Sequence, residues 1–234
     1  MDRSIWIGFD PREAASFAVA RASIRQFDRI TPIRGVVMEE LKASKLYTRP
    51  TERRLGKLWD GISGKYMSTE FAITRFLVPT LAKTGWALFC DCDVLFRENP
   101  ARLFDLANSK YAVMCVKHDY DPGAVLKMDE QRQYSYPRKN WSSVMLFNCQ
   151  HPANKKLTPE LVNSLPGLNL HQYCWLEDNE IGELPVEWNW LVGHSSEDVT
   201  PKLVHFTDGG PWFESFANVP YANEWRRELH RWAA

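Results

Sequence analysis

Asp91 and Asp93 are the residues whose types and spacing point most directly to chemistry. They follow the apolar residues 86–89, and the carboxyl ends of strands are where open α/β sheets place their ligands. Residues i and i+2 of extended backbone project to the same side, so both carboxylates can face one cation. Such oxygen ligands favour Mg²⁺ or Mn²⁺, which keep coordination positions for substrate phosphates. The pair predicts a metal site, although exposed loop acids give the same pattern.

The same segment allows a second chemistry. Residues 91–95 (DCDVL) also match the D-x-D-x-[TV]-[LV] pattern of haloacid-dehalogenase phosphatases, in which the first Asp is a nucleophile. In those enzymes the motif usually follows the first strand, whereas here two or more strand–helix units precede it. A phosphatase with Asp91 as nucleophile is therefore the alternative interpretation.

His205 stands in a similar position further along the chain. It follows the apolar Leu203 and Val204, and it precedes a turn that contains Gly209 and Gly210. Paired glycines let backbone amides approach a phosphate closely. Because a single His after a strand is often a hydrogen-bonded structural residue, its ligand role stays open at this point.

Asp10 combines two roles. It precedes Pro11, with Glu13 three positions later, which is the arrangement of a helix N-cap with its first turn. It also ends the first predicted strand and so lies at the same edge of the sheet as Asp91. Capping and ligand contact both remain open for this carboxylate.

These residues need a sheet whose strands end at one edge. Apolar runs predict strands at residues 5–9, 33–38, 86–89, 111–116, 143–148 and 202–206. Helical periodicity predicts helices at 12–27, 68–79, 101–107, 159–165, 171–176 and 222–232. Residues 49–65 are expected to form a loop, and 117–140 a functional insertion. The alternation predicts an α/β fold, with a mainly parallel central sheet and helices on both faces.

Composition limits the classes of protein that remain. The chain has 234 residues, 44% of them hydrophobic and 25% charged, which predicts one globular domain. Lys and Arg number 29, as do Asp and Glu, so the formal charge is zero and a nucleic-acid partner is not expected. The five cysteines show no CxxC spacing and are expected to be reduced and structural. No leader or apolar run of membrane-spanning length is present, so we expect a cytoplasmic protein.

The predicted helix at 222–232 is amphipathic and rich in Trp and Arg. This composition is typical of helices that lie on a membrane surface, so peripheral contact at the inner face of a membrane is one interpretation. Packing of the Trp face on the rest of the chain is the other interpretation and the favoured one. The residues concerned are Trp225, Arg226, Arg227, Leu229, Arg231 and Trp232.

Taken in order, several segments resemble the family 8 glycosyltransferases, the group that contains lipopolysaccharide galactosyltransferases and glycogenin. They are residues 7–10 (IGFD), 23–24 (SI), 74–79 (TRFLVP), 88–95 (LFCDCDVL), 143–148 (SVMLFN), and 205–206 (HF) with 211–212 (PW). The resemblance implies a single GT-A type nucleotide-sugar domain over residues 1–234. Its nucleotide-binding part would cover about 1–116 and its acceptor and donor-sugar part about 117–220, followed by the helix at 222–232.

The resemblance also implies an activity. It is the transfer of a sugar, with retention of its anomeric configuration, from a nucleotide donor to a hydroxyl of a glycan or glycolipid acceptor. UDP is the favoured nucleotide of the donor. Mn²⁺ is the expected cation, with Mg²⁺ as the alternative. The family's metal ligands are two motif aspartates and a late histidine, which match Asp91, Asp93 and His205.

Further roles follow from the same resemblance. The early Asp of the family contacts the nucleobase and matches Asp10, and the helix Arg near the donor matches Arg75. Asp178 and Asn179 fall where the family has an acid and an amide beside the reacting carbon. The remaining residues expected beside the nucleotide are Gly8, Cys92, Gly209 and Gly210.

The sequence departs from the family at two places. Gly210 stands where the family has a Lys that contacts the diphosphate, so the amides of Gly209 and Gly210, or Lys202, would have to replace it. A relative that binds a nucleotide sugar without transferring it is therefore a further alternative. The usual Asn-[Ala/Ser]-Gly before the Val-rich strand is replaced by residues 141–143 (WSS), which leaves the sugar open.

Overall fold

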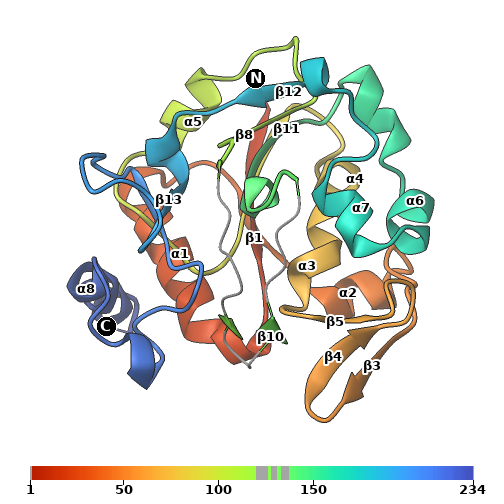
Figure 1. Cartoon of the computed structure of the whole chain (residues 1–234). Helices are drawn as coiled ribbons and strands as arrows, with labels where there is room; N and C mark the ends of the chain where they lie inside the picture. The colour runs from red at the N-terminus through yellow and green to blue at the C-terminus, as the bar shows by residue number, and fades with distance from the viewer. Residues whose placement is uncertain (1, 120–125, 128–130, 133–136, 234) are drawn as a thin grey trace.

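A computed structural model describes residues 2–119, 126–127, 131–132 and 137–233 (Figure 1). Its central sheet contains β1 (Arg3–Gly8), β2 (Ile33–Val36), β6 (Trp86–Cys90), β8 (Val113–Cys115), β11 (Val144–Asn148) and β12 (Ile181–Glu183). Their order across the sheet is β12-β8-β11-β6-β1-β2. β1 is parallel to β2 and β6, and β12 is parallel to β8, whereas β11 is antiparallel to both of its neighbours. The expected mainly parallel sheet is confirmed, with β11 as its reversed strand.

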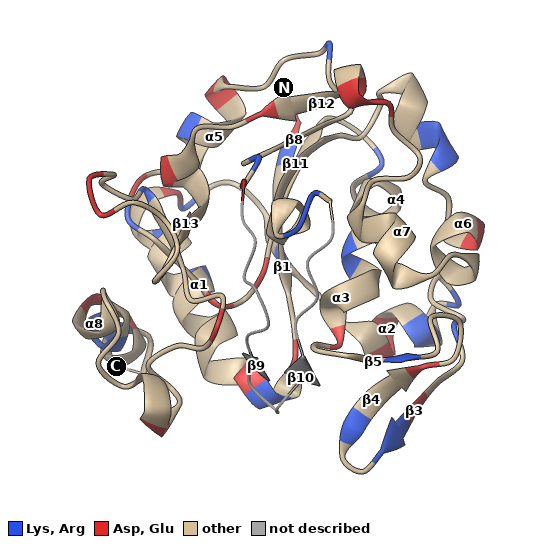
Figure 2. Ribbon diagram, viewed as in Figure 1, with Lys and Arg blue, Asp and Glu red and all other residues tan. Residues whose placement is uncertain are grey.

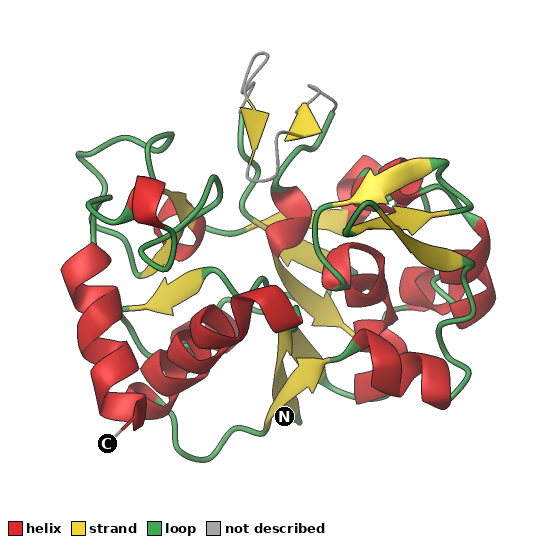
Figure 3. Ribbon diagram, turned by 90° about the horizontal axis from the view of Figure 1, so that it is seen from below, coloured by secondary structure: helices red, strands yellow, loops and turns green. Residues whose placement is uncertain are grey.

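Helices cover both faces of this sheet, as expected for an α/β fold (Figures 1 and 3). One face carries α1 (Ala14–Phe27), and the other carries α3 (Phe71–Thr74), α4 (Val78–Ala82) and α7 (Gly167–His171). The other α-helices are α2 (Met38–Ala43), α5 (Ala101–Asp105), α6 (Pro159–Ser164) and α8 (Ala222–Ala233). Short 3₁₀ helices are η1 (Pro11–Glu13), η2 (Arg75–Leu77), η4 (Trp141–Ser143), η5 (Pro152–Lys156), η6 (Asp178–Glu180), η7 (Val186–Asn189) and η8 (Glu214–Phe216).

A second, three-stranded sheet lies beside the first and consists of β7 (Val94–Phe96), β13 (Trp190–Leu191) and β14 (Leu203–His205). β14 pairs antiparallel with β7, which places His205 opposite Val94. β7 begins directly after Asp93, so this register carries the end of β14 to the aspartate pair. The small sheet is therefore the element that positions the late histidine.

The core explains why the central strands are apolar without alternation. Every residue of β6 is buried, as are the first four of β11, because helices cover both faces of the sheet. All five cysteines are free, as expected, and Cys90, Cys92 and Cys115 are buried in this core. Packing as small hydrophobic residues accounts for those three positions.

The closing helix α8 is amphipathic, as its sequence predicts, and packs against α1. Trp225 is buried among side chains of α1 and the small sheet, and Leu229 packs beside this cluster. Trp232 is 60% exposed, so packing on the body of the protein accounts for only part of the apolar face. Among the described residues, no helix combines the length and apolar character needed to cross a membrane.

The expectation of a loop at residues 49–65 is wrong. The segment forms β3 (Thr51–Arg54) and β4 (Lys57–Asp60), which pair antiparallel and continue to β5 (Lys65–Met67). Leu55 and Gly56 join β3 to β4 with positive φ angles of 51° and 78°, as in the primed turns of tight hairpins. The outward residues are mostly polar and basic (Figure 2), and this hid the strand pattern. A fully buried ion pair between Arg49 and Asp60 holds the base of the hairpin.

Two helix predictions also need correction. The predicted helix at 171–176 lies earlier, as α7, and the chain leaves helical geometry at Tyr173, whose φ is 54°. The predicted helix at 68–79 is divided into α3, η2 and α4, and Pro79 lies in the first turn of α4 instead of ending a helix. The predicted insertion at 117–140 lies largely outside the described residues, which include there only the paired strands β9 (Leu126–Lys127) and β10 (Gln131–Arg132) and its two ends.

Candidate functional site

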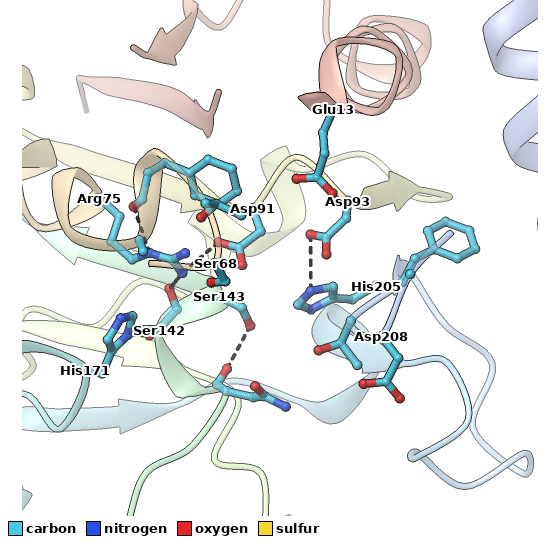
Figure 4. A pocket seen from close by; sticks show the side chains of 17 residues that line it. Glu13, Ser68, Arg75, Asp91, Asp93, Ser142, Ser143, His171, His205 and Asp208 are labelled. Atoms are coloured by element: carbon cyan, nitrogen blue, oxygen red, sulfur yellow. Dashed lines mark hydrogen bonds and ion pairs between the residues drawn. The ribbon is translucent and has the colours of Figure 1, made fainter. Parts of the chain in front are cut away.

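Asp91, Asp93 and His205 meet where the two sheets adjoin (Figure 4). One ligand atom of each residue lies within 4.8 Å of those of the other two. The Nε2 atom of His205 is 3.3 Å from Oδ1 of Asp93. The aspartates are half-buried and the imidazole is buried. The three ligands predicted from sequence therefore form one candidate metal site.

Backbone hydrogen bonds fix the segment that carries both aspartates. The amide of Asp91 donates to the carbonyl of Ser143 at 2.9 Å, and the amide of Phe206 donates to the carbonyl of Asp93 at 2.9 Å. The first bond ties the segment to the beginning of β11, and the second ties it to the residue after β14. The aspartate pair is thereby held from both sheets.

The donor set fits a divalent cation. Two carboxylate oxygens are the ligands that Mg²⁺ and Mn²⁺ prefer, and an imidazole nitrogen is a ligand of first-row transition metals. Close carboxylates are also costly when nothing positive lies between them. The residues of this site therefore could hold a divalent cation.

Arg75 lies beside this site and holds one of its carboxylates. Its Nη1 atom is 2.7 Å from Oδ1 of Asp91 and also donates to the carbonyl of Ser142 at 2.8 Å. Its guanidinium lies 5.3 Å from the ring centre of Phe71 and 5.1 Å from that of Phe89. Arg75, expected near the donor, thus lies beside the candidate metal ligands with Asp91 as its partner, and its catalytic role stays a prediction.

Glu13 is a site residue that sequence reasoning missed. It lines the same cavity and is almost fully buried, and the thiol of Cys92 lies 3.4 Å from its Oε2 atom. Burial, and then the negative charge of Asp93, raise the pKa of Glu13 to about 8. The sequence showed this residue only as part of a helix start, because its contact with residues 92–93 depends on tertiary structure.

A cavity of about 160 Å³ adjoins the metal site. The predicted residues that line it are the three metal ligands, Arg75 and Gly209. The other lining residues are Glu13, Ser68, Thr69, Phe71, Ala72, Asn140, Ser142, Ser143, His171, Phe206, Thr207 and Asp208. The cavity is thus mostly polar, with two titratable acids beyond the metal ligands.

His171 is a second site residue that the sequence did not reveal. It ends α7, its Nδ1 atom is 2.7 Å from the hydroxyl of Ser142, and its ring meets that of Phe76 edge-on at 5.2 Å. In Figure 4 it lies on the opposite side of the cavity from His205. Its helix was predicted too late in the chain, and this obscured its position.

Three predicted nucleotide contacts lie behind the cavity wall. Asp10 is fully buried and accepts hydrogen bonds from Arg12 and from the amide of Glu70, which confirms its capping role. Burial alone would raise the pKa of Asp10, but the Arg12 hydrogen bonds and charge outweigh it and lower that pKa. A Cβ atom on Gly8 would meet the Phe71 ring at 2.4 Å, and Cys92 is fully buried.

In the turn after His205, Gly209 and Gly210 both lie against aromatic rings. Gly209 lines the cavity with a φ of 141°, where a Cβ atom would meet the Phe216 ring at 2.7 Å. A Cβ atom on Gly210 would meet the ring of Trp212 at 1.9 Å. Lys202, the suggested substitute for the family's Lys, pairs instead with Glu187 at 3.1 Å.

Asp178 and Asn179 are not brought to this cavity. Both are exposed in η6, and Asp178 forms an ion pair with Arg138. The structure thus separates the two expected catalytic residues from the metal ligands, and their catalytic role stays a prediction.

Comparisons with known proteins agree with the fold. No family model matches the chain. It is 44% identical over 235 residues to Protein CDI of Arabidopsis thaliana, covering 97% of this chain and 86% of that one. This identity and coverage are high enough to show a common family.

Solved structures of glycosyltransferases share the fold at much lower identity. Apo GlyE of Streptococcus pneumoniae TIGR4 is 14% identical, with a TM-score of 0.62 over 100% of this chain. The galactosyltransferase LgtC, solved with donor and acceptor sugar analogs, is 14% identical, with a TM-score of 0.60 over 97% of this chain and 95% of its own. This chain spans 63% of GlyE and 51% of the bifunctional glycosyltransferase WbbM. The expected GT-A fold is therefore confirmed.

Proposed function

The chain belongs to the same family as Arabidopsis Protein CDI, and from its GT-A fold and its candidate metal site we propose that it is a metal-dependent glycosyltransferase. The observation that carries the proposal is the convergence of Asp91, Asp93 and His205 on one edge of a polar cavity. LgtC, with the same fold, was solved with donor and acceptor sugar analogs. The proposed reaction moves a sugar from a nucleotide donor, with UDP favoured, to a hydroxyl of a glycan or glycolipid, with retention at the anomeric carbon.

Mn²⁺ is the proposed cation, with Mg²⁺ as the alternative, held by Asp91, Asp93 and His205. When bound, it supplies a Lewis acid that stabilises the charge developing on the departing nucleoside diphosphate. Arg75 keeps the Asp91 carboxylate in place and offsets part of the negative charge of the pair. Gly209 lines the same cavity, and its backbone is proposed to lie beside the phosphates.

The sugar end of the cavity is proposed to lie at Ser142 and His171. These polar side chains line the cavity on the side away from His205 (Figure 4) and can hydrogen-bond sugar hydroxyls. In this proposal Gly8, Asp10 and Cys92 support the residues that line the cavity and do not contact the nucleotide themselves. A catalytic role for Asp178 and Asn179 would require them to approach from their exposed positions in η6.

A cytoplasmic location stays part of the proposal, as does peripheral contact with a membrane through α8. The exposed Trp232 and the Arg residues of that helix support such contact, whereas Trp225 is committed to the core. Sedimentation with anionic vesicles, compared between the wild type and Trp232→Ala, tests it.

The activity test is incubation with a panel of nucleotide sugars and Mn²⁺, with and without glycan acceptors, while release of nucleoside diphosphate is measured. Release that depends on Mn²⁺ and is lost in Asp93→Asn supports the proposal. Hydrolysis of phosphomonoesters without any nucleotide sugar, abolished by Asp91→Asn, would indicate the phosphatase instead. Calorimetric binding of a nucleotide with Mn²⁺ but no turnover would indicate an inactive binding protein.

A further inference from the structure

Asn189 links His205 of the candidate metal site to Ser143, the last residue of η4. It is fully buried at the end of η7. Its Oδ1 atom lies 2.9 Å from Nδ1 of His205, and its Nδ2 atom donates to the hydroxyl of Ser143 at 2.9 Å. The Ser143 hydroxyl in turn donates to the backbone carbonyl of Asn140 at 2.7 Å. These groups form one chain of hydrogen bonds that ends on a carbonyl.

The ending on a carbonyl fixes the direction of every bond in this chain. A backbone carbonyl can only accept, so the single hydroxyl proton of Ser143 points to Asn140. The Ser143 oxygen must then accept from its other neighbour, which requires the amide nitrogen of Asn189 on that side. The amide oxygen of Asn189 consequently faces His205. The hydrogen bonds of this network therefore decide which end of the Asn189 amide is oxygen and which is nitrogen, because the two ends have nearly the same shape.

An amide oxygen also only accepts, so Nδ1 of His205 must carry a proton. In the neutral imidazole the lone pair then resides on Nε2, the atom that lies 3.3 Å from Asp93 Oδ1 within the ligand cluster. We propose that Asn189 is a positioning residue that sets both the tautomer and the ring orientation of His205, so that Nε2 is the metal-binding atom. This inference rests on the proposed metal-dependent function.

Ser143 has a double part in this arrangement. Its carbonyl accepts the amide of Asp91, and its side chain fixes Asn189 and, through it, His205. Replacing Ser143 by Ala removes the hydrogen bond that, among the described residues, distinguishes the oxygen from the nitrogen of the Asn189 amide. The amide then turns its NH₂ group toward Nδ1, the proton moves to Nε2, and the metal-binding lone pair is lost. A residue with no direct contact to the cation thus controls its affinity.

The tautomer is tested by ¹⁵N NMR of the metal-free protein above the titration range of histidine, with His205→Gln used to assign the signal. We expect a protonated Nδ1 in the wild type and a protonated Nε2 in Ser143→Ala and Asn189→Leu. Ser142→Ala is the matched control, because its hydroxyl bonds His171 instead, and it should leave the His205 tautomer unchanged. A wild type with a protonated Nε2, or a Ser143→Ala variant without any change, would overturn the inference.

Calorimetric titration of the metal-free protein with Mn²⁺ gives the second readout. Loss of a group that orients a metal ligand typically lowers affinity about 10–100-fold, and this is expected for Asn189→Leu and Ser143→Ala. Asn189→Asp keeps an oxygen that accepts the proton of His205 Nδ1, so this variant should retain the affinity for Mn²⁺. A difference between Asn189→Asp and Asn189→Leu would exclude a general effect of changing the packing at this position. If the wild type binds no Mn²⁺, the proposed function fails. If the wild type binds but the variants bind equally well, only the present inference fails.

Discussion

The guanidinium of Arg75 lies 2.7 Å from the carboxylate of Asp91, and both side chains line the cavity. Replacing Arg75 by Met keeps an unbranched side chain between the two Phe rings but removes the charge. Breaking a buried ion pair at one partner costs about 3–5 kcal/mol in general, and the partial exposure of Asp91 places this one at the lower end. We expect lower stability in urea denaturation and a transfer rate reduced with it. Equal stability of the variant and wild type would contradict a structural role for the pair.

Glu13 should make the stability of the metal-free protein fall as pH rises. Its pKa is raised from 4.5 to about 8 in the folded state, so between these values the folded protein holds a proton that the unfolded chain releases. The free energy of unfolding then decreases by about 1.4 kcal/mol per pH unit in this window and levels off above it. Glu13→Gln mimics the protonated acid and should remove this slope in urea denaturation between pH 5 and 8. Added Mn²⁺ should reduce the slope in the wild type, because a cation near Asp93 offsets the charge that raises this pKa.

Mn²⁺ should stabilise the folded protein through its ligands. A ligand that binds only the folded state at 100 times its dissociation constant adds about 2.7 kcal/mol, which is measurable as a higher Tm. Asp93→Asn should lose this Mn²⁺-dependent rise, and EDTA should reverse it in the wild type. Glu52→Gln, on the exposed face of the hairpin, is the control that should keep the full rise. An unchanged rise in Asp93→Asn would place the cation elsewhere.

Substitution of His171 should lower the transfer activity strongly, whereas substitution of Asp178 should hardly change it. Leaving one buried hydrogen-bonding group of a substrate without its partner costs about 1–3 kcal/mol, so His171→Ala should lower kcat/KM roughly 5–150-fold. Its Mn²⁺ affinity should be unchanged, since the metal ligands lie across the cavity (Figure 4). Asp178→Ala should stay within about twofold of wild type, because an exposed ion pair contributes little. The reverse order of effects would restore the role that family resemblance gives to Asp178.

The Arg49–Asp60 ion pair should contribute to the free energy of unfolding, and it lies outside the cavity. Both side chains are fully buried, and Arg49 also donates to the backbone carbonyls of Val162 and Leu165. Arg49→Ala leaves Asp60 buried without its cation, which costs about 3–5 kcal/mol. Arg54→Ala in the same hairpin breaks an exposed pair and should cost about 0–1 kcal/mol. Urea denaturation of the two variants checks the contrast.

The sequence pointed to the three candidate metal ligands because their signal is local. Apolar strands reveal where they end, and Asp91, Asp93 and His205 each lie at or just beyond the end of such a run. The hairpin at β3–β4 was missed because only alternate residues, such as Leu58 and Asp60, face inward. A strand that exposes one face offers a weaker pattern than a buried one.

The residues that the sequence did not reveal are those whose role depends on distant partners. Glu13 acquires its raised pKa from Asp93 and burial, Asn189 acquires its role from His205, and His171 reaches the cavity because α7 ends there. None of these contacts produces a periodicity or a characteristic residue spacing in the amino-acid sequence. Asp178 shows the converse, since its spacing fits a family motif while its side chain faces solvent.

The pairing of β7 with β14 has a consequence for biosynthesis. Two of the three candidate ligands come from the first half of the chain and the third from its last segment, and the pairing of β7 with β14 brings them together. While a ribosome is still making the protein, the nascent chain has no complete cage for the ion until β14 has emerged. Binding of the proposed cation is therefore expected late in synthesis. A chain that ends before β14 lacks His205 and should not bind the cation at this site.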